Sequence, residues 1–148
     1  MTYSISNNRA TKKRLFSYLA ATAFCALFSA VYEHFSHGVY VNFMIYAFAI
    51  PLGLGVIPQL VLLLKPQLDT GGPWQHLLHG CAVATLSFGA IVQGIVQIYG
   101  TTNPYTKWYL VIGLAMLAGS LLMWATGLAG SALRRSAPPR SLSIGTEQ

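Results

Sequence analysis

Residues 15–35 read LFSYLAATAFCALFSAVYEHF, and this stretch decides the fold class. It carries no charged side chain before Glu33, and its length matches the roughly 20 residues that a helix needs to cross a hydrocarbon core of about 30 Å. Three further apolar stretches follow at 41–64, 76–99 and 108–128. The pattern predicts an all-α, polytopic membrane protein whose core is a bundle of four transmembrane helices.

The composition agrees with this prediction. Of 148 residues, 54% are hydrophobic and only 8% are charged, with a mean hydropathy of +0.53; soluble proteins average about 25% charged residues. The length leaves room for one bundle, predicted over 14–130, with disordered segments at 1–13 and 131–148. A cleaved signal peptide is an alternative interpretation of the first apolar stretch, but that stretch is long for such a peptide.

The positive charge is unevenly distributed along the chain. The net charge is +6, and Lys107 is the one basic residue at the predicted outer ends of the helices. Because basic residues accumulate on the cytoplasmic side, both termini and the 65–75 loop are expected in the cytoplasm of a bacterial-type cell membrane. The chain has no basic stripe interleaved with aromatic residues, the pattern that would indicate nucleic-acid binding. The expected partner is therefore the lipid bilayer. The eight remaining basic residues are Arg9, Lys12, Lys13, Arg14, Lys65, Arg134, Arg135 and Arg140.

An acidic residue at the outer end of the first apolar stretch is the leading candidate for function. An ionisable group at membrane depth costs at least about 2.5 kcal/mol, so it usually has a partner and a role. Glu33 and His37 are four residues apart and share a helix face, with His34 between them. This spacing predicts a ligand or proton site. A metal site formed by the same three residues and an interfacial salt bridge without further function are the alternatives.

Polar residues in the second and third apolar stretches are expected near this carboxylate. Gln93 and Gln97 lie one turn apart in the outer half of the third stretch, and Tyr99 follows them. Asn42 and Tyr46 begin the second stretch. Buried amides need partners because lipid offers none, so these residues predict a polar vestibule facing outward. Interhelical hydrogen bonds without a ligand are the alternative.

The second apolar stretch is interrupted at 51–58, PLGLGVIP. Each proline removes a backbone donor and bends the helix. We interpret the interruption as a packing kink, with an ion-coordinating broken helix as the alternative. Gln59 is a candidate to cap a carbonyl that the prolines leave free.

A second pair of histidines, His76 and His79, begins the third stretch beside Trp74. The sequence predicts that they anchor this end at the membrane interface. A haem shared with the first pair is excluded, because the two pairs lie near opposite faces, about 30 Å apart. No other cofactor is predicted.

Small residues at helical spacing in the third and fourth stretches predict close helix packing, or a homodimer or membrane-protein partner. The two cysteines lie inside apolar stretches and are interpreted as small apolar residues. The small residues are Gly80, Ala84, Ser87, Ala115, Gly119, Ala125 and Ala129, and the cysteines are Cys25 and Cys81.

The chain carries no recognised catalytic motif and only three acidic residues. The expected function is therefore non-enzymatic: binding or translocating a small solute or cation through the outward polar site. A structural or interaction subunit of a membrane complex is the first alternative. A metal-dependent membrane enzyme is the second.

Overall fold

The computed structural model describes residues 2–35, 42–101 and 104–136, without the side chains of 2–8, 33, 44 and 134–136. These ranges are helical and contain no strand, which confirms the all-α class. The elements are α1 (Thr2–Phe35), α2 (Asn42–Ile45), a π-helical segment (Pro51–Val56), α3 (Ile57–Leu64), a 3-10 turn (Pro66–Leu68), α4 (Pro73–Ile98) and α5 (Thr106–Ser136).

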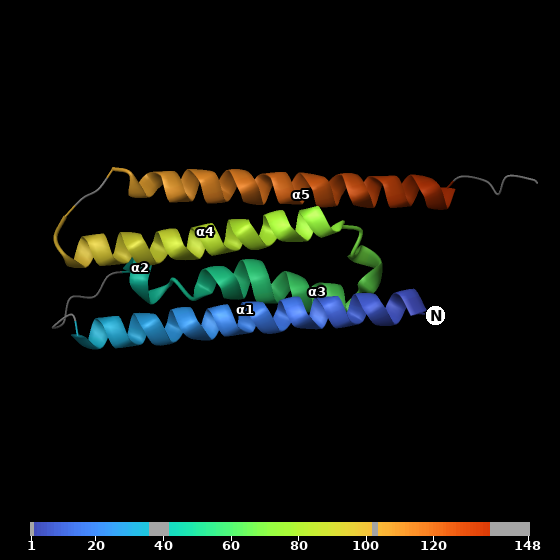
Figure 1. The fold of residues 1–148 in the computed structure, drawn as a ribbon. Coiled ribbons are helices and arrows are strands. Elements are labelled where there is room, and N and C mark those ends of the chain that lie inside the picture. The colour runs from blue at the N-terminus through green and yellow to red at the C-terminus, as the bar shows by residue number, and fades with distance from the viewer. Residues whose placement is uncertain (1, 36–41, 102–103, 137–148) are drawn as a thin grey trace, which may run out of the picture.

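The helical layers follow the order of the chain. Figure 1 shows α1, then α2 and α3, then α4, then α5, with successive layers running in opposite directions. The start of α1, the 65–72 connection and the end of α5 therefore share one end of the bundle. We call this the basic end; among residues with described side chains it carries Arg9, Lys12, Lys13, Arg14 and Lys65.

Three helices are long and apolar enough to cross a membrane: Arg9–Tyr32 within α1, Pro73–Ile98, and Thr106–Leu133 within α5. All three extend beyond the predicted bounds. The predicted disorder over 1–13 differs from the structure, because α1 begins at Thr2. At the other end of the chain, α5 continues to Ser136, past the predicted end of the last span at 128.

The stretch 41–64, predicted as one span with an interruption at 51–58, is not a continuous α-helix. It is divided into α2, a turn at 46–48, the π-helical segment and α3. The apolar helix from Pro51 to Leu64 covers only about 21 Å at 1.5 Å per residue. It ends before Pro66, because a proline disfavours helical geometry in the residue preceding it, and Lys65 has φ −129°.

α4 and α5 form an antiparallel hairpin in close contact. Gly113 faces Leu86, and Gly89 faces Tyr109; a methyl group on either glycine would collide with the facing side chain. Glycine therefore sets the distance between the two helices, as is common where membrane helices pack. α4 begins with Pro73 in its first turn, a position where a missing N–H costs no helical hydrogen bond.

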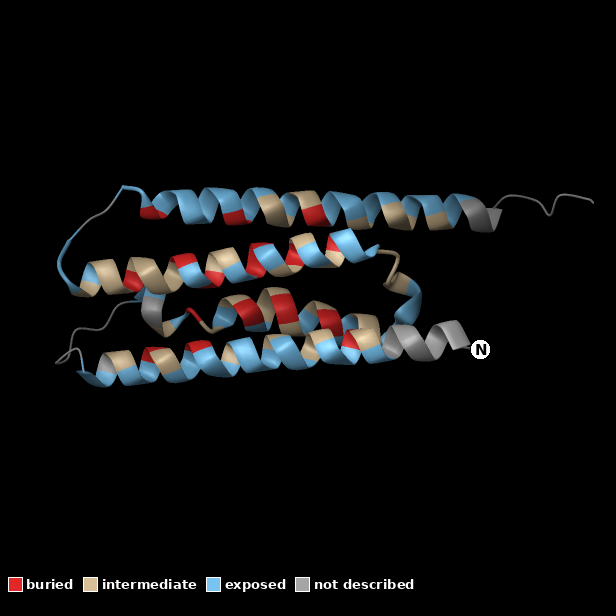
Figure 2. Ribbon diagram, viewed as in Figure 1, coloured by how far each residue is buried: buried red, intermediate tan, exposed pale blue. Residues whose placement is uncertain are grey.

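Polar side chains occupy the interior, while large apolar side chains lie outside. Figure 2 shows that burial concentrates on the two middle layers and that α1 and α5 are mostly exposed. A water-soluble bundle buries large apolar residues instead. Among the described residues, the buried apolar side chains are small: Cys25, Ala47, Ala82 and Val83. The buried polar residues are Thr11, Ser29, Gln59, Gln75, His79, Ser87, Thr106 and Ser120.

Candidate functional site

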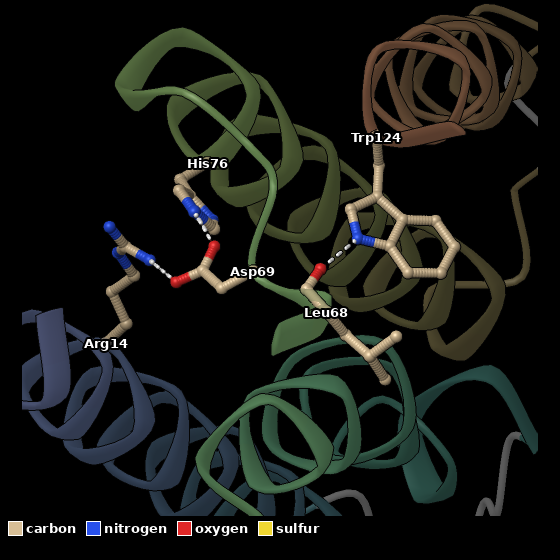
Figure 3. A network of polar contacts seen from close by, with 5 residues as sticks. All are labelled: Arg14, Leu68, Asp69, His76 and Trp124. Atoms are coloured by element: carbon tan, nitrogen blue, oxygen red, sulfur yellow. Dashed lines mark hydrogen bonds and ion pairs between the residues drawn. The ribbon is translucent and has the colours of Figure 1, made fainter. Parts of the chain in front are cut away.

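The most connected polar residues lie at the basic end, around the acid of the 65–72 connection. Asp69 accepts a hydrogen bond from His76 Nε2 at 2.9 Å, and its second carboxylate oxygen lies 4.0 Å from an Arg14 guanidinium nitrogen (Figure 3). Only 4% of the Asp69 side chain is exposed, although it belongs to a loop. The carboxylate therefore joins the connection to α1 and α4 in a partly buried ion pair.

The same connection is also held by α5. The indole N–H of Trp124 donates to the Leu68 carbonyl at 2.9 Å (Figure 3). A tryptophan needs a partner for its N–H when it is partly buried, and here that partner is a loop carbonyl. Leu68 and Asp69 thus connect the 65–72 segment to three helices, α1, α4 and α5.

His79 forms a second polar centre, one turn further along α4. Its Nε2 donates to the Leu54 carbonyl at 2.8 Å, and its Nδ1 lies 3.3 Å from Ser120 Oγ. Pro58 has no N–H to give to Leu54, four residues earlier, so the histidine supplies the missing donor. The Tyr18 ring packs edge-on against the imidazole, with 6.5 Å between the two ring centroids. His79 therefore links α4 to every other layer of the bundle.

These contacts correct two sequence predictions. His76 and His79 were expected to anchor the membrane interface, but His79 is buried and His76 bonds a buried carboxylate. Gln59 was expected to cap a freed carbonyl, but the donor to the Leu54 carbonyl is His79. The predicted interruption of the second span is confirmed, and the adjacent helix satisfies a carbonyl there, as a packing kink requires.

A pocket of about 320 Å³, partly open to the outside of the bundle, lies between α3, α4 and α5 beside these centres. We call it the inner chamber. Two buried amides are part of its wall, Gln59 at 2% exposure and Gln75 at 7%. The Oε1 atom of each lacks a hydrogen-bond partner. The rest of the lining is Ile57, Pro58, Val61, Leu62, Leu68, His76, His79, Leu121 and Trp124.

The predicted outward site is described only in part. The Glu33 side chain and the whole of His37 lie outside the described residues, so their pairing stays a prediction. His34 is exposed, with its ring 5.5 Å from that of Phe35. The proposed metal site also stays a prediction, because it uses these same residues. Among the residues the structure describes, no group of three His, Cys, Asp or Glu side chains is arranged to hold a metal ion.

The other predicted site residues occupy different surroundings. Asn42 and Tyr46 are exposed and line a hollow of about 540 Å³ that is otherwise apolar. Gln93 is half-buried and Gln97 exposed, and neither lines this hollow. Tyr99 is exposed and hydrogen-bonds the side chain of Tyr32 on α1. The described residues of this group therefore do not converge on one cavity.

Sequence reasoning missed Asp69, Gln75 and Arg14. Asp69 lies in the predicted 65–75 loop, and the chain alone does not show that such a loop folds back onto the bundle. One signal was available: Asp69 and His76 flank a short turn with glycines and a proline, seven residues apart. Such a turn returns the chain on itself and brings its flanks together.

Comparison with protein-family models, with curated proteins and with solved structures finds no match for this chain.

Proposed function

We propose that this chain is a multi-pass integral membrane protein of the bacterial-type cell membrane, crossing it four times with both termini in the cytoplasm. Three long apolar helices and the polar interior support this proposal. The position of the basic residues supports the orientation, because they gather where the termini and the 65–72 connection meet. The divided second segment supplies the fourth crossing, with α2, the π-helical segment and α3 together covering the depth that Pro51–Leu64 alone does not.

We further propose that the protein binds a small solute inside the bundle, at the inner chamber. The observation that carries this is a pocket whose otherwise mostly apolar lining includes two buried amide residues, Gln59 and Gln75, together with His76 and His79. Ligand pockets in proteins are mostly apolar, with a few polar groups that fix orientation, and span about 300–1,000 Å³. The inner chamber has that composition and lies at the lower end of that range. Binding is thus placed at the basic end, opposite the end that the sequence favoured.

Quenching of Trp124 by acrylamide tests this proposal. Replacing Trp74 and Trp108 with Phe leaves Trp124 as the sole indole, and acrylamide is a small neutral solute that enters aqueous or polar cavities. We expect quenching of Trp124 in lipid nanodiscs, reduced severalfold by Leu62→Phe, which fills the chamber. Leu60→Phe is the matched control, since Leu60 is exposed on the same helix and does not line the chamber.

The proposal fails if acrylamide leaves Trp124 unaffected while brominated lipids quench it. That outcome would place the indole against acyl chains and leave no solute-accessible chamber. Equal effects of the two leucine substitutions would also count against the proposal.

A second candidate function is that of an interaction subunit. On α5, Val111, Ala115, Ala118, Leu122 and Ala125 share one face and are all exposed. Small residues let another membrane helix approach closely. Crosslinking in native membranes distinguishes the two functions: a single stable partner joined through this face favours the subunit.

A further inference from the structure

We propose that the 65–72 connection is a movable cover over the inner chamber, and that its release from α1 and α4 at Asp69 admits the solute from the basic end. This inference rests on the solute-binding function proposed above and adds the way in which that site is opened and closed. The boundaries of the chamber, the contacts that hold the connection, and the backbone at its two ends each point to this role.

The inner chamber is bounded differently on each side. At the end further from the connection, His79 joins the second segment to α5 through the Leu54 carbonyl and Ser120. In the proposed membrane location the lateral opening faces acyl chains, because its rim consists of exposed apolar residues. The 65–72 connection covers the remaining end, which we propose to face the cytoplasm. A water-soluble molecule therefore reaches the chamber past this connection. The rim residues are Ile57, Val61 and Leu121.

The residues that hold the connection in place also line the chamber. Leu68 is part of the lining, and its carbonyl accepts the indole N–H of Trp124, another lining residue, at 2.9 Å. Asp69 accepts a hydrogen bond at 2.9 Å from His76, which also belongs to the lining (Figure 3). Movement of the connection away from the bundle would therefore break these bonds and remove part of the chamber wall in the same step.

The connection satisfies much of its own backbone. The N–H groups of residues 68, 69 and 70 all donate to carbonyls within 65–68, at 2.9 to 3.1 Å. These hydrogen bonds are internal to the connection, so they persist when it moves. The contact between Asp69 and Arg14, at 4.0 Å, is longer than a hydrogen bond. Opening therefore costs a few side-chain contacts and leaves the internal turn intact.

Both ends of the connection can absorb a change in backbone direction. Lys65 has left helical geometry, with φ −129° and ψ 77°. Gly71 and Gly72 precede the first turn of α4, and a methyl group on Gly72 would meet nothing within 4 Å. Hinges are commonly a few loop or element-terminal residues of this kind, often small. The connection can thus pivot as one unit.

A reversible lock between the connection and α5 tests the inference. A β-carbon built at Gly127 lies 3.3 Å from the β-carbon of Thr70, slightly below the range of about 3.5–4.5 Å typical of disulfides, so a small separation seats the bond. Thr70→Cys/Gly127→Cys is made with Cys25→Ala and Cys81→Ala and with Trp124 as the sole tryptophan.

Oxidation of this pair in nanodiscs should reduce acrylamide quenching of Trp124 severalfold, and dithiothreitol should restore it. Thr70→Cys alone, treated in the same way, is the matched control and should show no change. Reversal by the reductant distinguishes a locked cover from a misfolded variant.

Release of the connection is tested by Asp69→Ala, which removes both contacts of the carboxylate. We expect acrylamide quenching of Trp124 to rise severalfold. Gln67→Ala is the matched control, because Gln67 is exposed in the same connection and lies outside the lining. Adding Leu62→Phe to Asp69→Ala should remove most of the rise, since the quencher then finds the chamber filled.

The possible results separate this inference from the function beneath it. If neither the lock nor Asp69→Ala changes quenching while Leu62→Phe alone still reduces it, the movable cover is overturned and the chamber stands. If Asp69→Ala raises quenching equally with and without Leu62→Phe, the connection shields only the indole and the inference is also overturned. If acrylamide fails to quench Trp124 even in the reduced protein, the solute-binding function is overturned as well.

Discussion

At the residue scale, His79 shows how a membrane-embedded bundle resolves a local backbone problem. Pro58 leaves the Leu54 carbonyl without its usual helical donor, and lipid offers no substitute. The imidazole Nε2–H donates to that oxygen at 2.8 Å, and the other ring nitrogen lies 3.3 Å from Ser120 Oγ on α5. This side chain of α4 thus supplies the donor missing at the kink of the second segment and also contacts α5.

We predict that His79→Leu lowers the free energy of unfolding by about 1–3 kcal/mol, the cost of leaving buried polar groups unsatisfied. Titration with SDS in mixed micelles, followed by circular dichroism, measures the change. His34→Leu is the control, since that ring is exposed and should change stability by less than about 0.5 kcal/mol. Equal losses in both variants would show that the contacts of His79 are energetically unimportant.

At the element scale, glycine controls the approach of α4 and α5. Gly113 lies where a methyl group would meet the Leu86 side chain, so the contact permits no larger residue without separating the helices. Gly130, further along the same helix, has nothing within 4 Å of its would-be methyl. The two positions have the same helical backbone and differ in what faces them.

This difference predicts opposite effects of one substitution. Gly113→Ala should destabilise the protein by about 1–3 kcal/mol through overpacking. Gly130→Ala should be neutral or stabilise it by up to about 1 kcal/mol, because alanine favours the helix. Both are measured by the same SDS titration. A stabilising Gly113→Ala would mean that the two helices are further apart than described here.

At the scale of the whole molecule, the polar interior follows from the solvent that the proposed membrane location provides. Lipid chains are as apolar as leucine, so burying large apolar side chains between helices gains little there. Packing of small residues and interhelical hydrogen bonds hold such a bundle together instead. The buried serines, glutamines and His79 fit this arrangement, as do the exposed leucines and phenylalanines of α1 and α5.

The proposed orientation predicts a labelling pattern. In a background with Cys25 and Cys81 changed to Ala, Thr101→Cys should react with a membrane-impermeant maleimide in intact cells. Gln67→Cys should react only after permeabilisation, since the two positions lie at opposite ends of the bundle. The reverse pattern would invert the orientation. Labelling of both in intact cells would contradict the number of crossings.

Much of the fold could be predicted from the sequence because its signals are local. Long apolar stretches form helices wherever water or donors are absent, so the all-α class and three long helices followed directly. The interruption at 51–58 was equally visible, since proline removes a donor whatever surrounds it. The helix ends that lie beyond the apolar stretches could not be predicted, because polar residues at a terminus carry little helical signal.

The candidate site depended on tertiary structure, because it joins residues that no periodicity relates. Asp69 reads as a solvated loop acid until the 65–72 connection folds onto the bundle and pairs it with His76 and Arg14. Gln59 was expected to cap a backbone carbonyl and Gln75 had no predicted role, and only the structure places both in the lining of one pocket. The sequence by itself determined the apolar helices and the end where positive charge gathers, since both follow from hydrophobicity and charge along the chain. Only the tertiary structure decided which polar groups meet inside, because that depends on which helix faces turn toward one another.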